Sequence, residues 1–285
     1  MPKRTVDRAE ARPEQPRGAP KDELRERIQR HLKRLGLTEF DVEAHLRWAL
    51  EKKPSDIESL ECLLATAAAF KLARSIEWRF DRSGLKVKKT LASFDWDFQP
   101  KLDRRTVKAL FDLGFVARHE DILITGKTGT GKSHLLQALV LKACESELTV
   151  RYARCVDLID DLYAGLADGS YERRMRQWCR AQFLVVDDVG LGQLKRRDDE
   201  PTAAHMLFTL LDRRHMTAST AITSNLLLSH WGKYLGDATL AAAVLDRLAA
   251  SAIRIDIDGP SYRQHLARKR AQEQGVEPPV AEEQA

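Results

Sequence analysis

The stretch from Gly126 to Ser133 reads GKTGTGKS and directly follows the apolar run 122–124. Its spacing matches G-x-x-x-x-G-K-[ST], a pattern in which glycines let the backbone curl so that consecutive N–H groups point at a polyphosphate. A helix that begins there turns the positive end of its dipole toward the anion. A Gly-rich turn that fits by chance is the alternative, but the apolar run before the loop and the helical periodicity after it favour a nucleoside triphosphate site.

The loop residues have distinct expected parts in that site. Lys132 would reach the β- and γ-phosphates, and the hydroxyl of Ser133 would be a ligand of Mg²⁺. ATP and Mg²⁺ are therefore the expected cofactors. The expected nucleotide-binding residues are Gly126, Lys127, Thr128, Gly129, Thr130, Gly131, Lys132, Ser133 and His134.

Two acids end a second apolar run, FLVVDD at residues 183–188. In P-loop folds the end of a neighbouring buried strand supplies the group that holds Mg²⁺ and the group that positions the attacking water. We expect Asp187 to hold Mg²⁺ and Asp188 to orient the water. An apolar run that ends in two acids is common by itself. Its place after a phosphate-binding loop is what indicates a site for Mg²⁺ and the attacking water.

A further polar side chain, Asn225, ends the segment TAITSN. Open parallel sheets place their ligand groups at the carboxyl ends of the strands, so Asn225 could contact the γ-phosphate or the lytic water. The residues alone leave a second interpretation open, in which Asn225 only caps a helix that starts near Leu228.

The elements that must position these groups alternate between short apolar runs and helical patterns. This alternation predicts an α/β fold, with a parallel sheet covered by helices on both faces. The expected strands are 122–125, 149–153, 183–186, 220–223 and 252–257.

Helical periodicity also predicts three helices upstream, the third opened by a capping box of Ser55 and Glu58. Residues 1–20 are rich in Pro, Arg and Glu, a composition typical of disorder. The segment Phe94 to Phe98 is the expected cover over the adenine base. The expected domains are a disordered lead (1–20), a helical domain (21–81), a linker that wraps onto the next domain (82–103), an ATPase domain (104–265) and a polar tail (266–285).

Composition restricts the class of protein. A chain of 285 residues with 43% apolar residues can bury a sizeable core. The N-terminus lacks the apolar core of a signal peptide and no apolar run is long enough to span a membrane, so a cytoplasmic protein is expected. The four cysteines form no C-x-x-C pair, which argues against a zinc or redox motif. They are Cys62, Cys144, Cys155 and Cys179.

The net charge of +5 is distributed unevenly. Residues 1–110 hold 25 Lys and Arg against 18 Asp and Glu, a balance of +7, which leaves −2 for the rest of the chain. A basic excess of this kind is compatible with a phosphate-rich partner, although solvated basic helices are common.

Six motifs, in order, resemble the IstB type of AAA+ ATPase, the helper protein of a bacterial insertion sequence, related to the DnaC and DnaI helicase loaders. They are SFDWDFQPKLDRR, ILITGKTGTGKSHLLQAL, FLVVDDVG, TSN, LDRL and GPSYR, spread over roughly residues 20–265. The resemblance implies a AAA+ P-loop fold and DNA-stimulated ATP hydrolysis. It also implies a homo-oligomer with ATP sites between subunits, which binds and bends double-stranded DNA and engages an IstA-like transposase.

The resemblance further implies catalytic roles for individual residues. It matches Lys132 and Ser133 to the Walker A pair, Asp187 to the Walker B metal ligand, Asn225 to the sensor asparagine, Arg247 to the arginine that reaches a neighbouring subunit's site, and Arg263 to the arginine that senses the γ-phosphate from within. A guanidinium delivered from a neighbour would couple hydrolysis to assembly. Asp188 stands where most AAA+ members have glutamate, which predicts slow turnover.

Three basic clusters are candidates for DNA contact. Arg173, Arg174 and Arg176 follow the Gly169 turn on a predicted helix, and the others are 195–197 and the lysines 86, 88 and 89. Each cluster is more often a solvated face than a DNA contact. Such contacts would position the protein on phosphates without reading sequence.

Two other functions fit parts of the pattern. A replicative helicase loader would use the same ATPase core, with its N-terminal helices gripping the helicase. A small-molecule kinase would share the phosphate-binding loop, but it would leave Asn225, Arg247 and Arg263 without a common role. The favoured interpretation is an oligomeric, DNA-dependent ATPase that serves a transposase.

Overall fold

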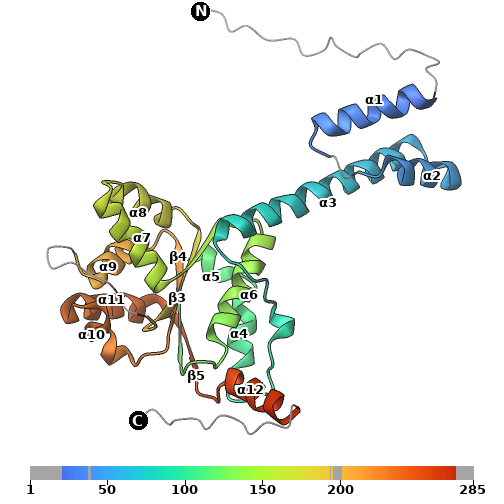
Figure 1. The fold of residues 1–285 in the computed structure, drawn as a ribbon. Helices are drawn as coiled ribbons and strands as arrows, with labels where there is room; N and C mark the ends of the chain where they lie inside the picture. Colours follow the sequence, from blue (N-terminus) through green and yellow to red (C-terminus); the bar gives the residue numbers. More distant parts are fainter. Residues whose placement is uncertain (1–20, 38–39, 193, 195–200, 274–285) are drawn as a thin grey trace, which may run out of the picture. The chain divides into compact units, whose positions relative to one another are not determined.

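The computed structural model describes residues 21–37, 40–192, 194 and 201–273, drawn in colour in Figure 1. The chain forms two compact units that divide between Arg74 and Ser75. This division lies inside one long helix, upstream of the domain boundary expected after residue 81. The expected disordered lead and the end of the polar tail lie outside the described residues.

The first unit is helical. It contains α1 (Lys21–Arg34), α2 (Val42–Lys52) and the first part of α3 (Asp56–Ser83). The predicted capping box at the start of α3 is confirmed, because Ser55 N donates to Glu58 Oε2 over 2.8 Å and Glu58 N donates to Ser55 Oγ over 3.3 Å. Leu32, Phe40 and Val42 form its small core.

The second unit is built on a five-stranded parallel sheet with the order β2-β3-β4-β1-β5. The strands are β1 (Asp121–Gly126), β2 (Val150–Arg154), β3 (Phe183–Val189), β4 (Ser219–Ser224) and β5 (Ala252–Ile257). All five lie where the alternation of apolar runs predicted them, and the α/β fold is confirmed. The order brings the carboxyl ends of β1, β3 and β4 side by side.

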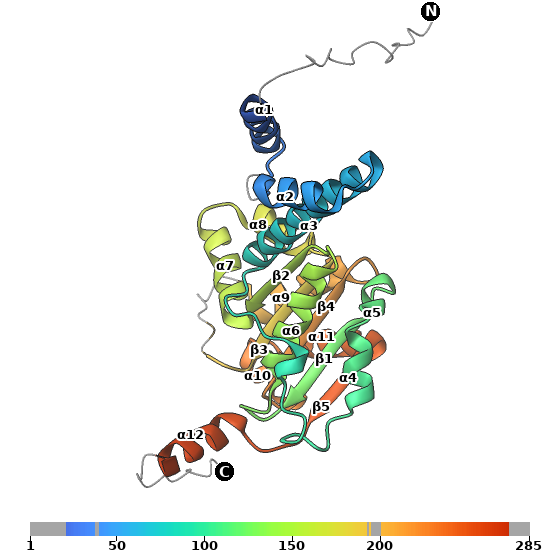
Figure 2. The same ribbon diagram turned by 90° about the vertical axis from the view of Figure 1, so that its right-hand side faces the viewer.

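Helices lie on both sides of this sheet in Figure 1, and Figure 2 looks onto one of its faces. Ile122 and Ile124 point into one core and Leu123 into the other, because successive side chains of a strand alternate between faces. The first face carries α4 (Arg104–Leu110), α5 (Gly114–Ala117) and α6 (Lys132–Glu145). The second carries α7 (Cys155–Ala167), α8 (Tyr171–Cys179), α9 (Ala203–Arg214), α10 (Trp231–Leu235) and α11 (Ala238–Ser251).

Two further segments complete this unit. Within the expected linker (82–103), the end of α3 is followed by one short helix, η1 (Leu91–Ser93), and the segment packs on the first face through Leu85, Phe94 and Leu102. β5 is followed by α12 (Tyr262–Glu273), which runs into the region expected to be a polar tail. Another short helix, η2 (Leu228–His230), follows β4.

A buried arginine, Arg214, ties together the ends of several elements. Its side chain is 1% exposed, and its guanidinium donates to the carbonyls of Cys179, Ala181 and Ser219 over 2.9, 2.7 and 2.5 Å. Burial lowers its pKa to about 10. These bonds satisfy carbonyls that would otherwise be buried without donors.

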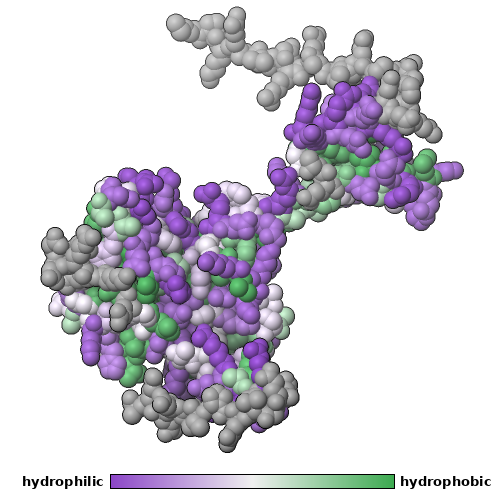
Figure 3. Space-filling model, viewed as in Figure 1, coloured by the Kyte–Doolittle hydropathy of each residue, from purple (hydrophilic) through white to green (hydrophobic). Residues whose placement is uncertain are grey.

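On the face shown in Figure 3, hydrophilic residues cover most of the second unit, and hydrophobic residues form small separate groups. None of the described helices is long and apolar enough to cross a membrane. All four cysteines are free thiols, and Cys144 and Cys155 are buried.

Candidate nucleotide-binding site

The phosphate-binding loop joins β1 to α6, as its pattern predicted, and glycines are required at two of its positions. Gly129 has φ +84°, and a Cβ atom on it would lie 2.1 Å from Oγ of Ser261. Gly131 has φ +104° and caps α6, where a Cβ atom would lie 2.7 Å from the Phe94 ring. Larger residues would be strained in this backbone and would clash with both neighbours.

Lys132 begins α6 and folds back over the loop. Its Nζ donates to the carbonyl oxygens of Gly126 and Lys127 over 2.7 and 2.9 Å. Burial lowers the pKa of Lys132, an effect that the nearby carboxylates of Asp188 and Asp187 oppose. The side chain is thus held at the loop, where its charge faces the two acids that end β3.

Asp187 is brought next to the loop from β3. Ser133 Oγ donates to Asp187 Oδ1 over 3.1 Å, so the two side chains predicted to hold Mg²⁺ are in direct contact. The carboxylate is 1% exposed. Two hydroxyl donors that sequence reasoning missed also hold it: Tyr152 donates to Oδ2 over 2.5 Å, and Thr223 donates to Oδ1.

The parallel pairing of the strands brings these two donors to Asp187. Tyr152 pairs with Val185 in the register of β2 and β3, and Thr223 belongs to β4 on the other side of β3. In the sequence, the signal that could have indicated these two donors is the presence of hydroxyl residues near the ends of the predicted strands. Burial raises the pKa of Tyr152, and the charge of Asp187 adds to the effect, so the phenol stays a donor.

Asp188 takes an unusual backbone conformation for a residue with a side chain. Its φ is +59°, and the register between β3 and β4 shifts between Val186 and Val189. The Asp188 N–H donates to Thr223 Oγ1 over 2.8 Å. Burial raises the pKa of the Asp188 carboxyl, and repulsion by Asp187 raises it further. The irregularity turns Asp188 toward the cavity, although it directly follows Asp187 in the chain.

A cavity of about 420 Å³ opens over the loop. Its walls include loop residues 128–134, the segment 93–95, Asp188 and the pair Tyr262 and Arg263. Loop residues Gly126 and Lys127 contribute their carbonyls to Lys132 instead. The described structure therefore brings Asp188 and Arg263 together with most of the predicted loop set, although they are far apart in the chain.

Aromatic rings form the side of the cavity expected to cover the base. Phe98 packs edge-on against Tyr262 with ring centroids 5.0 Å apart, and Phe94 packs edge-on against His134 at 5.5 Å. The Tyr262 N–H donates to the Gly129 carbonyl over 2.9 Å, which links the GPSYR motif to the loop. His134 bonds Thr90 and Ser93, and burial lowers its pKa.

Asn225 lies just after β4, beside Gly190. Its Oδ1 is buried and has no hydrogen-bond partner among the described residues. The capping interpretation is wrong, because η2 is preceded by Leu227 and no side chain caps it. A buried acceptor that has no partner among the described residues is unusual, because nearly all buried polar groups are hydrogen-bonded.

Arg247 lies on α11 and does not line the cavity. It forms an ion pair with Asp212, and its guanidinium lies 4.2 Å from the centroid of the Phe208 ring. Both of these partners belong to α9, outside the phosphate-binding loop.

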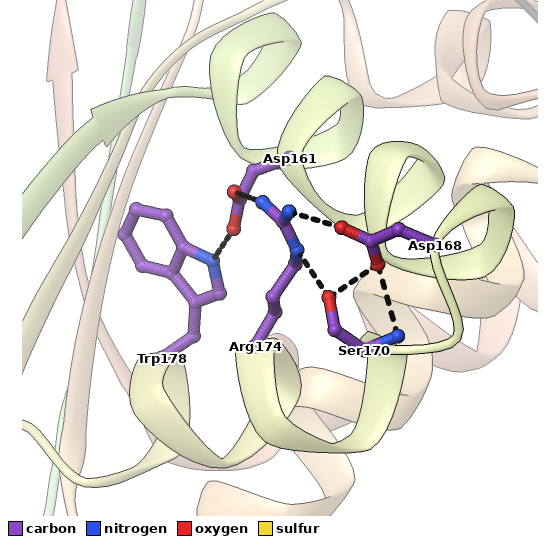
Figure 4. Close-up of polar contacts among 5 residues, drawn as sticks. All are labelled: Asp161, Asp168, Ser170, Arg174 and Trp178. Carbon is purple, nitrogen blue, oxygen red and sulfur yellow. Dashed lines mark hydrogen bonds and ion pairs between the residues drawn. The ribbon is translucent and has the colours of Figure 1, made fainter.

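The predicted arginine cluster on α8 does not form one uniform surface. Arg174 pairs with Asp161 and, over 2.8 Å, with Asp168, and its Nε donates to Ser170 (Figure 4). Hydrogen bonds from Ser170 and Arg174 lower the pKa of Asp168 to about 2. Two carboxylates already neutralise Arg174, whereas Arg173 and Arg176 are exposed. The 195–197 cluster lies outside the described residues.

Comparisons with known proteins agree with this geometry. The family model described as "IstB-like ATP binding protein" matches residues 30–271. The ATP-binding protein named for insertion sequence IS5376 of Geobacillus stearothermophilus is 33% identical, over 88% of this chain and 98% of that protein. The one named for insertion sequence IS21 of Pseudomonas aeruginosa is 35% identical, over 81% and 85%.

A solved structure shares the fold. AMPPCP-bound DnaA from Aquifex aeolicus superposes with a TM-score of 0.51 at 21% identity, covering 66% of this chain and 56% of that one. The two proteins share an α/β fold with a parallel sheet between helices, the fold class that the sequence predicted. With the cavity, the loop and the family match together, the chain belongs to the IstB-like ATP-binding proteins of insertion sequences.

Proposed function

We propose that this protein is a DNA-stimulated ATPase that oligomerises on double-stranded DNA, bends it, and recruits or activates an IstA-like transposase. The observation that supports ATP hydrolysis is the hydrogen bond from Ser133 Oγ to Asp187 Oδ1, 3.1 Å long, beside the Gly-rich loop. Insertion-sequence relatives support the transposition part.

Three residues that line the cavity would act in hydrolysis. Lys132 would exchange its two loop carbonyls for the β- and γ-phosphates of ATP. Asp188 would accept a hydrogen bond from the attacking water and orient it toward the γ-phosphate. Arg263, in the same cavity, would contact the γ-phosphate from within the chain.

The residues also fit Mg²⁺. Ser133 Oγ and Asp187 Oδ1 are hard oxygen donors brought together from two elements, and Tyr152 and Thr223 orient the carboxylate. Ser133 and Asp187 would hold the ion, which when bound neutralises charge on the phosphates.

Two polar groups would complete the site. Asn225 Oδ1, unpaired in the described structure, would accept a hydrogen bond from the lytic water. Arg247 would leave Asp212 and enter the ATP site of a neighbouring subunit, where it neutralises charge that develops on the transferred phosphoryl group. Assembly and hydrolysis would then depend on each other.

The proposal is tested by measuring ATP hydrolysis and sedimentation with and without duplex DNA. We expect ATP to drive oligomers on duplex in the absence of any helicase, and we expect duplex to stimulate hydrolysis. Lys132→Ala should abolish both the ATP-driven oligomers and the ATP hydrolysis. A wild-type protein that stays monomeric on duplex with a non-hydrolysable ATP analogue would contradict the proposal.

Subunit mixing tests the role of Arg247 directly. Arg247→Ala and Lys132→Ala should each be inactive alone. Their mixture should regain activity, because an Arg247→Ala subunit keeps an intact loop and can receive the arginine of a Lys132→Ala neighbour. A mixture as inactive as its components would refute an arginine shared between subunits.

A further inference from the structure

A second cavity of the ATPase unit lies beside β2, an edge strand of the sheet, and shares no lining residue with the cavity over the phosphate-binding loop. It has a volume of about 690 Å³. Its charged lining consists entirely of arginines: Arg79 and Arg82 from the last turns of α3, Arg151 of β2 and Arg180 after α8. The other lining residues are uncharged, among them Trp78.

Most of this positive charge has no counter-charge. Among the described residues, Arg82, Arg151 and Arg180 form no ion pair, and Arg79 alone has one, with Glu147 at 3.6 Å. Burial lowers the pKa of Arg151; the charge of Asp161 opposes this effect, and the nearby charge of Arg82 adds to it. Four guanidiniums with few carboxylates among them repel one another, so an external polyanion would be attracted.

The positive surface continues along β2. An adjoining cavity of about 610 Å³ shares Arg82 and Arg151 with the first and adds Lys86, together with Arg154, whose charge Asp157 compensates. Its two acids are already engaged, since Asp157 accepts both hydrogen bonds of Arg154 and Asp161 is bound by Arg174 and Trp178. The two cavities form one groove with a row of cationic side chains, which we call the β2 groove.

Aromatic rings lie among these cations. Trp78 is 57% exposed, and the Arg82 guanidinium lies 4.7 Å from the centroid of its ring. Arg151 lies 3.8 Å from the centroid of the Trp178 ring. This stacking holds the planar groups in place at the groove wall, which reduces the conformational entropy lost when they bind an anion.

We propose that the β2 groove binds the phosphate backbone of duplex DNA. The inference rests on the proposed function, which requires DNA binding, and it names the surface that provides it. A phosphate chain fits better than a small anion, because the cations are distributed along two joined cavities. Guanidinium forks match phosphate oxygens, and contacts to phosphates position a protein on DNA without reading its sequence.

The test compares matched double variants by fluorescence anisotropy with a labelled duplex and a non-hydrolysable ATP analogue. Arg82→Ala with Arg180→Ala removes two exposed groove charges. We expect a loss of affinity of about tenfold or more, and a log–log salt slope shallower by about 1.8, between about 50 and 200 mM salt. Arg105→Ala with Lys108→Ala removes two exposed charges of α4, outside both cavities, and should behave as wild type.

Two further measurements separate the outcomes. Arg82→Lys with Arg180→Lys should recover most of the salt slope, and binding of a fluorescent ATP analogue should be equal in all variants. If wild type binds duplex and the groove variant binds with the same affinity and slope, the groove assignment is wrong while the proposed function stands. If wild type itself fails to bind duplex, both fail.

Discussion

The phenolic hydroxyl of Tyr152 donates a 2.5 Å hydrogen bond to Oδ2 of Asp187. Tyr152 lies on the edge strand and also lines the second cavity of the β2 groove. The same residue therefore bonds the carboxylate predicted to hold Mg²⁺ and lines the surface proposed to hold DNA. This arrangement provides a direct physical connection between the two sites.

Tyr152→Phe tests whether this bond positions Asp187. Loss of a donor to a buried carboxylate costs about 1–2 kcal/mol, so we expect a DNA-stimulated kcat about tenfold lower and a higher Mg²⁺ requirement. ATP affinity should change little, because the loop is intact. Tyr234→Phe, which removes a hydroxyl bonded to the Leu191 carbonyl, is the control. An unchanged Mg²⁺ titration curve would show that the bond is dispensable.

Asp188→Glu tests the expected reason for slow turnover. The longer side chain would bring the carboxylate closer to the γ-phosphate, so we expect faster DNA-stimulated hydrolysis. Because φ is +59° here and Asp tolerates this region better than Glu, the variant should also lose about 0.5–1 kcal/mol of unfolding free energy. A rate equal to or below that of wild type would remove the basis of this explanation.

Asp188→Asn probes the raised pKa of that carboxyl. A folded-state pKa above the unfolded value means that the fold binds the proton more tightly, so stability decreases as pH rises from the unfolded pKa through the folded one. We therefore expect Asn to raise Tm at neutral pH, with a gain that shrinks as pH falls toward the ordinary carboxyl range. Thermal unfolding across that range measures the difference. A gain that grows in acid would contradict the raised pKa.

Arg214→Met tests the buried guanidinium that joins the strand ends. Several carbonyls would lose their donor, so we expect a loss of about 3 kcal/mol or more in unfolding free energy. The neighbouring Arg213→Met is a matched control, because Arg213 pairs with the exposed carboxylate of Glu172 and should cost less than about 1 kcal/mol. Urea unfolding compares the two. Equal losses would mean that the Arg214 network adds no stability.

Local patterns were sufficient to predict much of this protein. The loop from Gly126 to Ser133 was predictable because each glycine serves a local backbone conformation and the apolar run before it forms β1. The five strands followed from apolar runs, since burial on both faces of a parallel sheet requires them. The capping box of Ser55 and Glu58 spans three residues and needs no distant partner.

Contacts between distant residues were decided by the tertiary structure. Tyr152 and Thr223 meet Asp187 only because the strand order places β2 and β4 on either side of β3. Arg174 was predicted as a DNA contact, yet the packing of α7 against α8 supplies it with two carboxylates. The sequence by itself determined which chemistry the loop and β3 can perform, because short-range spacing sets backbone geometry. Which side chains surround that chemistry, and which arginines keep an uncompensated charge, depended on long-range packing that no local pattern encodes.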